Sequence, residues 1–154
     1  MEKGILMIRT LVVAGTLLLG VSAVIAQQDQ LKETQTIMKG NGKNAGALSA
    51  IVKGEKPYDQ ATVDAALAQF DDTAKKLPKL FPASLKGKTF EGDYSPSDKI
   101  WEDKAGFSEH IASFGKTVTE AKTQIKDLDS LKTTLPVIGK QCGGCHETFR
   151  VKNG

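Results

Sequence analysis

Aromatic residues are scarce in this sequence, cysteines number two, and no run of like charge occurs along the chain. Aromatics make up 6% of the residues and include a single tryptophan. That supply is too small for the base-stacking surface that single-stranded nucleic acid requires. Charged residues of both signs are interspersed and leave a formal net charge of +3, without the basic stripe of a nucleic-acid-binding domain. We therefore expect no nucleic-acid partner.

One long apolar run is present, and it stands at the beginning of the chain. A basic start, MEKGILMIR, precedes the uncharged stretch TLVVAGTLLLGVSAVIA, which ends in small residues before QQDQ. This pattern is typical of a signal peptide, whereas a retained membrane anchor needs about 20 apolar residues. We predict cleavage after Ala26, a signal peptide over residues 1–26, a single domain over residues 27–154, no retained anchor, and a periplasmic location. An oxidising compartment leaves the cysteines open to a disulfide, a metal site or a covalent attachment.

The rest of the chain has helical periodicity in four segments and no strand alternation. Apolar residues separated by three and four positions predict one helix over residues 31–52, a second over 63–77 begun by Asp59, a third over 107–125 and a fourth over 128–149. Ser95 to Asp98 is a predicted start for the third helix, with Pro96 in its first turn. We expect an all-α fold, an antiparallel four-helix bundle around one core.

Both cysteines lie in the stretch GKQCGGCHETFRVKNG, on the inward stripe of the predicted fourth helix. Cys142, Cys145 and His146 form C-x-x-C-H, the attachment motif of c-type haem. Cysteines one helical turn apart can bond two vinyl groups of a haem, and the adjacent imidazole can reach the iron. The alternatives are a thiol-disulfide redox pair and a zinc site, which needs a fourth ligand. The motif predicts one covalent haem c near the carboxyl end of the domain.

Together, the signal peptide, the four helical stripes and the late haem motif resemble the class II c-type cytochromes, the cytochrome c′ family. Other stretches that carry the resemblance are VKGEKPYD, LPKLFP, the pair IW, and CGGCHETFR. The resemblance implies that Arg150 lies in the proximal haem pocket, where it offers hydrogen bonds and positive charge. It also implies that two copies can form a homodimer.

The resemblance leaves the sixth iron ligand to be decided, and Met38 is the residue in question. It is the one methionine after residue 26, on the inward stripe of the first helix, which lines the distal haem face in this family. Thr34 stands where many cytochromes c′ have an arginine, and QQDQLKETQTIMKGNGKN is similar to the low-spin, methionine-ligated members. We expect His146 and Met38 to ligate the iron of an electron carrier with periplasmic redox proteins as partners. The alternative is a five-coordinate cytochrome c′ that binds nitric oxide or carbon monoxide. No catalytic acid, base or nucleophile stands out, so we expect no enzyme.

Overall fold

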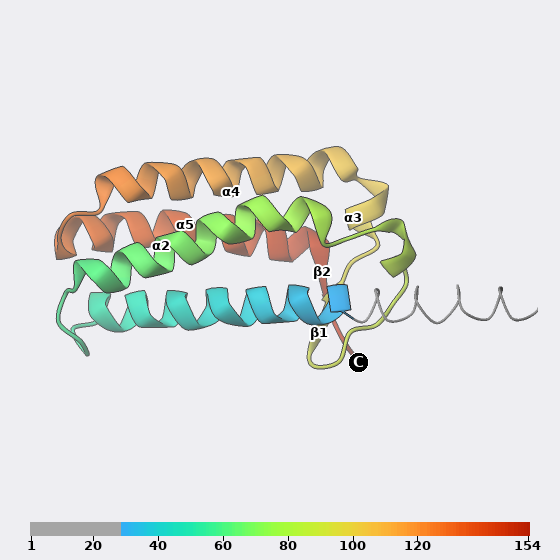
Figure 1. The fold of residues 1–154 in the computed structure, drawn as a ribbon, viewed down its shortest axis with the longest axis horizontal. Helices are drawn as coiled ribbons and strands as arrows, with labels where there is room; N and C mark the ends of the chain where they lie inside the picture. The colour runs from blue at the N-terminus through green and yellow to red at the C-terminus, as the bar shows by residue number, and fades with distance from the viewer. Residues whose placement is uncertain (1–28) are drawn as a thin grey trace, which may run out of the picture.

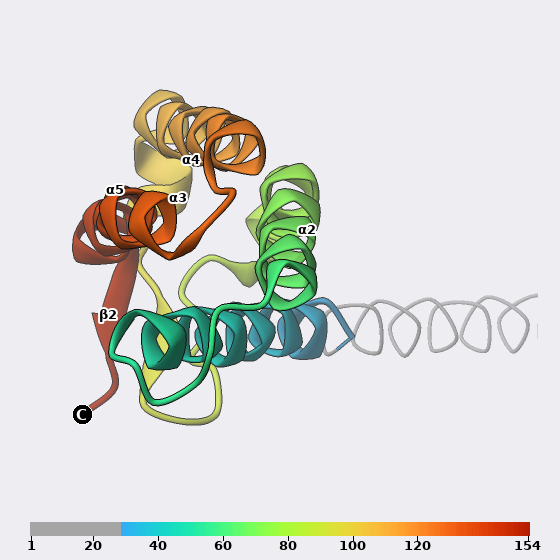
Figure 2. The same cartoon turned by 90° about the vertical axis from the view of Figure 1, so that its left-hand side faces the viewer.

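The computed structural model describes residues 29–154, which form a bundle of four long helices (Figure 1). The predicted signal peptide, residues 1–26, lies outside the described residues. Seen from the end of the bundle, the helix over residues 29–52 is inclined to the other three (Figure 2). The other long helices are α2 (Gln60–Lys76), α4 (Lys104–Gln124) and α5 (Leu128–Phe149). The predicted four-helix bundle is therefore present, and successive long helices run in opposite directions (Figure 1). The connections on either side of α2 differ, because the one to α4 spans residues 77–103.

Aspartates begin three of the long helices. Asp59 accepts a hydrogen bond from the Thr62 backbone at the start of α2, as the sequence predicts. Asp103 caps α4, and Asp127 caps α5 in a reciprocal pair with Ser130. Such caps satisfy backbone N–H groups that have no partner within the helix. Within residues 29–154, no helix is both long enough and apolar enough to cross a membrane.

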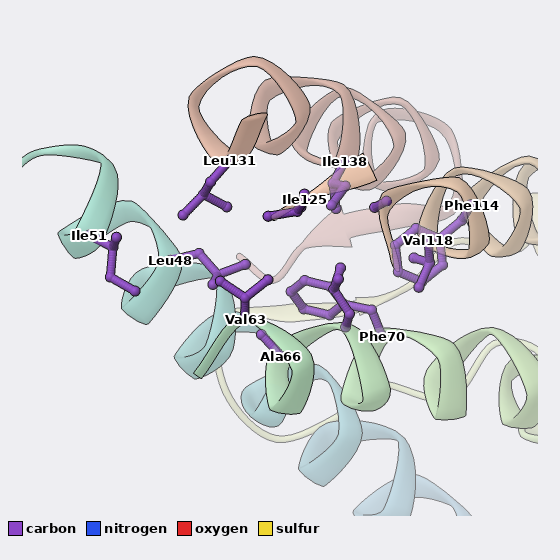
Figure 3. Close-up of a cluster of buried hydrophobic side chains, with 12 residues drawn as sticks. Leu48, Ile51, Val63, Ala66, Phe70, Phe114, Val118, Ile125, Leu131 and Ile138 are labelled. Carbon is purple, nitrogen blue, oxygen red and sulfur yellow. The ribbon is translucent and has the colours of Figure 1, made fainter. Parts of the chain in front are cut away.

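Apolar side chains from all four helices meet in a core cluster (Figure 3). The predicted stripes of the second, third and fourth helices face this interior. In the first helix, Ile37 and Ile51 are both buried but lie outside the predicted inward stripe. That stripe comprised Leu31, Thr34, Met38, Asn41, Ala45, Leu48 and Val52. A helix that packs against two neighbours buries a wider face than one line of residues. The labelled core residues are Leu48, Ile51, Val63, Ala66, Phe70, Phe114, Val118, Ile125, Leu131 and Ile138.

The segment before α4 corrects two expectations. Instead of starting a helix, Tyr94–Pro96 forms a short strand, β1, which pairs antiparallel with β2 (Arg150–Lys152) directly after α5. A short helix, α3 (Lys99–Glu102), follows and ends at Asp103 before α4 begins. A residue before proline favours extended backbone, and proline fits the end of an edge strand. The prediction of no strands was therefore wrong, although the fold is helical in every long element.

Candidate haem-binding site

A cavity of about 650 Å³ lies between the helix over residues 29–52, the three other long helices and the loop before α3. Its volume is within the usual range for small-molecule and cofactor sites. Most of its wall is apolar, as a site for a flat hydrophobic group requires. The apolar lining includes Phe70, Leu77, Phe107, Ile111, Phe114 and Ile138.

The C-x-x-C-H motif occupies the last two turns of α5, and all three of its reactive side chains line this cavity. Cys142, Cys145 and His146 are each half-buried. No disulfide joins Cys142 to Cys145. Their three-residue spacing sets them on one face of the helix, with His146 beside the second thiol. Within residues 29–154, no group of three or more His, Cys, Asp or Glu side chains gathers as a metal ion would require.

Burial sets the protonation of this motif. It raises the pKa of the Cys142 thiol, and it raises the pKa of the Cys145 thiol with a smaller contribution from the neighbouring cysteine. Both thiols are therefore protonated near neutral pH. For His146, burial first and the Arg150 charge second lower the pKa of the imidazole. A neutral imidazole has the free nitrogen lone pair that a metal ligand needs.

Met38 reaches the same cavity from the helix over residues 29–52, where it is half-buried. Thr34, one turn earlier, also lines the cavity, and its hydroxyl donates to the Gln30 carbonyl at 2.9 Å. This part of the wall therefore holds a thioether and a satisfied hydroxyl. Two of the cavity residues that follow Met38, Gly42 and Ala45, are small, and a Cβ at Gly42 would meet nothing within 4 Å. Gly42 therefore adds no bulk to the wall one turn after Met38.

Arg150 lies at the cavity but not in a helical turn after His146, because α5 ends at Phe149. The guanidinium carbon stands 4.0 Å from the centroid of the Tyr94 ring, and the side chain is exposed. His110 of α4, for which the sequence suggests a boundary or surface position, is half-buried. Its ring packs against Phe149 at 5.5 Å and contributes to the cavity wall.

Sequence reasoning missed two parts of the wall. One is the run Phe90 to Pro96, seven consecutive residues of the loop before α3. The other is a polar pair in which the buried Thr73 of α2 donates to the Asn41 side chain at 2.8 Å. Asn41 lies on the predicted inward stripe, but the sequence around it does not reveal Thr73 as its hydrogen-bond partner. The loop has no hydrophobic periodicity from which its place at the cavity could be predicted.

The residues around the cavity fit a covalently attached haem c. Two thiols at helical spacing can form the thioether links, an imidazole and a thioether are available for the iron, and apolar walls can cover the ring. Gly42 and Ala45 add little bulk to the wall that carries Met38. The donor set is that of a c-type cytochrome.

Comparisons with known proteins agree with this donor set. The family described as Cytochrome C′ matches residues 29–150. The chain is 60% identical over 149 residues to "Cytochrome c-556" of Rhodopseudomonas palustris, covering 96% of this chain and 100% of the relative. It is 39% identical over 145 residues to "Cytochrome c′" of the same organism, covering 94% and 97%. An "NMR-validated structural model for oxidized R.palustris cytochrome c556" has a TM-score of 0.74 and 58% identity, covering 82% of this chain and 99% of that one. The chain therefore belongs to the cytochrome c′ family, the class II c-type cytochromes, and its cofactor is covalently bound haem c.

Proposed function

We propose that this cytochrome is a periplasmic electron carrier whose haem lies in the cavity at the end of α5. In this proposal Cys142 and Cys145 hold the haem through thioethers, His146 is the proximal iron ligand and Met38 the distal one. Haem c supplies reversible one-electron exchange at its iron.

The observation that carries the proposal is that Met38 and His146 line one cavity from two different helices. Met38 is also the one methionine after residue 26. Among the cavity residues of the helix over residues 29–52, Met38 supplies a thioether, a side chain that ligates haem iron opposite a histidine in c-type cytochromes.

The protein's own residues support electron transfer in two ways. The apolar wall keeps water from the haem, and surroundings of low dielectric constant raise the reduction potential of the haem. A soft thioether from Met38 favours the reduced iron more than the oxidised iron. No side chain at the cavity is arranged as an acid, a base or a nucleophile toward a substrate, so we propose no enzymatic activity.

Export and partner choice extend the proposal. The signal-peptide pattern of residues 1–26 supports a periplasmic location, which is typical of a c-type haem. Exposed lysines on the two helices that hold the ligands, Lys39, Lys43 and Lys140, would attract an acidic redox protein. Formation of a homodimer stays a prediction.

The second candidate is a five-coordinate cytochrome that binds nitric oxide or carbon monoxide. Its support is that two of the cavity residues after Met38, Gly42 and Ala45, have small side chains. In that case Met38 packs on the haem without bonding the iron. The wild-type iron would then be high-spin.

Absorption spectra of the purified protein, oxidised and reduced, test the choice. His/Met ligation gives low-spin spectra in both states, together with the weak sulfur-to-iron band of the oxidised form. A high-spin spectrum in either state at neutral pH supports the gas-binding alternative and removes Met38 as a ligand.

A further inference from the structure

The loop over residues 86–96 forms one wall of the haem cavity and is held by the segment that follows α5. Seven consecutive loop residues, Phe90 to Pro96, line the cavity. Phe90 and Ser95 are buried, whereas Glu91, Gly92 and Asp93 between them are exposed. The loop thus has two buried anchors and an exposed rim. In Figure 1 it reaches β1 at the end of the bundle where β2 leaves α5.

Asn153 makes four hydrogen bonds to this loop. Its side-chain Nδ2 donates to the Phe90 carbonyl at 3.0 Å and to the Gly92 carbonyl. Its Oδ1 accepts from the Ser95 hydroxyl at 2.6 Å, and its backbone N–H donates to the Asp93 carbonyl at 2.9 Å. The carboxamide therefore uses both of its ends on the loop.

The loop geometry makes this pattern specific for asparagine. Gly92 has a φ of +99°, which a residue with a Cβ rarely adopts, and this conformation accompanies the turn of its carbonyl toward Asn153. Ser95 relays the contact inward, because its hydroxyl oxygen accepts from the Phe90 backbone N–H at 2.9 Å. A carboxylate in place of the amide would keep the contact to Ser95 but face two carbonyl oxygens without a donor.

Other contacts to the loop are fewer. Gln35, from the helix that carries Met38, donates to the Glu91 carbonyl at 2.6 Å in an exposed position. Arg150 lies over the Tyr94 ring. The ladder between β1 and β2 has three residue pairs, and a two-stranded sheet of that length is marginal in water by itself. Among residues 29–154, Asn153 therefore makes the largest number of hydrogen bonds to the exposed rim, two against one from Gln35.

We propose that the loop over residues 86–96 is a cover over the haem, and that Asn153 is the positioning residue that keeps it closed. The proposal rests on the haem site given above. Closure keeps water and small ions from the haem, and solvent exposure is one of the levers by which a protein sets a haem potential. Small reagents would then reach the haem directly only when the loop opens locally. Such segments can open without global unfolding.

The test uses the intact holoprotein and three variants that remove hydrogen bonds between Asn153 and the loop. Asn153→Asp keeps the shape and removes the two side-chain donors, and Asn153→Ala removes the whole carboxamide. Ser95→Ala removes one of the four contacts together with the acceptor of the Phe90 N–H. Val151→Thr is the matched control, because Val151 is exposed in β2 and the change conserves shape and charge. Amide hydrogen exchange at Phe90 reports closure, and core amides of Phe114 and Val118 report global stability.

We expect exchange at Phe90 to become roughly tenfold faster in both Asn153 variants, while the core amides stay protected. Exchange at Phe90 should accelerate at least as much in Ser95→Ala, because this variant also removes the acceptor of the Phe90 N–H. Oxidation of the reduced protein by hexacyanoferrate(III), measured in about 1 M salt to screen the introduced charge, should accelerate several-fold in the Asn153 variants and less in Ser95→Ala, which keeps the Asn153 bonds to the loop carbonyls. The control should match the wild type in both measurements.

Two results would overturn the proposal. Unchanged exchange at Phe90 in both Asn153 variants would show that this residue does not hold the loop. Faster exchange with unchanged oxidation would show that the loop does not restrict access to the haem. Neither result depends on the sixth ligand, which the wild-type spectra report separately.

Discussion

Thr73 of α2 donates a 2.8 Å hydrogen bond to Asn41 of the helix over residues 29–52, at the wall of the haem cavity. Thr73 is fully buried, and Asn41 stands three residues after Met38 on the same helix. Residues three apart are neighbours on a helix surface. This polar contact therefore ties the helix that carries Met38 to α2 beside the proposed ligand.

Thr73→Val should test the strength of that tie. The substitution conserves shape but leaves the Asn41 Oδ1 without its short hydrogen bond, which should reduce the free energy of unfolding by about 1–3 kcal/mol. Denaturant unfolding of the holoprotein measures the loss. Thr36→Val is the matched control, because the Thr36 hydroxyl bonds only its own helix and is exposed; its effect should stay within about 0.5 kcal/mol. Equal losses in the two variants would show that the contact to Asn41 adds no stability.

Asp71 predicts a pH dependence of stability. Its hydrogen bonds to Lys122 of α4 and to Lys75 of α2 lower the pKa of the carboxyl below the ordinary 3.8. A lowered pKa stabilises the folded state above about 3.8, and this contribution disappears as the pH falls through the lower folded-state value. Asp71→Asn should therefore cost about 0.5 kcal/mol near neutral pH. The difference from the wild type should vanish toward pH 2–3 and shrink in high salt.

Asp72→Asn serves as the control for that measurement. Asp72 pairs with Lys76 within α2, and both side chains are about half exposed. Its replacement should change the free energy of unfolding by less than that of Asp71, which bridges two helices. A pH-independent difference between Asp71→Asn and the wild type would contradict the proposed ion-pair origin.

Much of this structure follows from local sequence pattern. The four helices were predictable because Val118, Leu131 and similar residues recur at helical spacing, and the haem motif because its three residues are contiguous. The hydrogen bonds of Asn153 to the loop were not predictable, because about 60 positions of sequence separate Asn153 from Phe90 and Ser95. The same holds for the cavity position of His110, which depends on where α4 crosses Phe149. The strand at Pro96 was missed because Ser-Pro-Ser-Asp also fits a helix start.

The two cysteines predict covalent attachment of the haem. Intact mass of the denatured wild type should exceed that of the processed chain by one haem, and acid acetone should leave the colour with the protein. Cys142→Ala and Cys145→Ala should each keep a single thioether, and the double variant should release the haem. In the proposed site haem fills a cavity of about 650 Å³, so the double variant should also unfold with less cooperativity. A wild-type mass that corresponds to a bare chain with a disulfide would support the thiol redox alternative instead.

Met38→Leu separates iron ligation from packing. Leucine fills nearly the same volume but has no sulfur, so loss of packing should cost less than about 1.5 kcal/mol. If the thioether bonds the iron, the iron of the variant should become largely high-spin and lose the sulfur-to-iron band. The reduction potential should fall. The reduced variant should bind carbon monoxide rapidly, whereas the wild type should bind it slowly. Leu31→Met is the control, because it adds a thioether on the same helix at a position that does not line the cavity, and its spectra should match the wild type. If Met38 only packs against the haem, the wild type and Met38→Leu should share one high-spin spectrum and bind carbon monoxide at similar rates, and that result would assign the protein to the gas-binding members of its family.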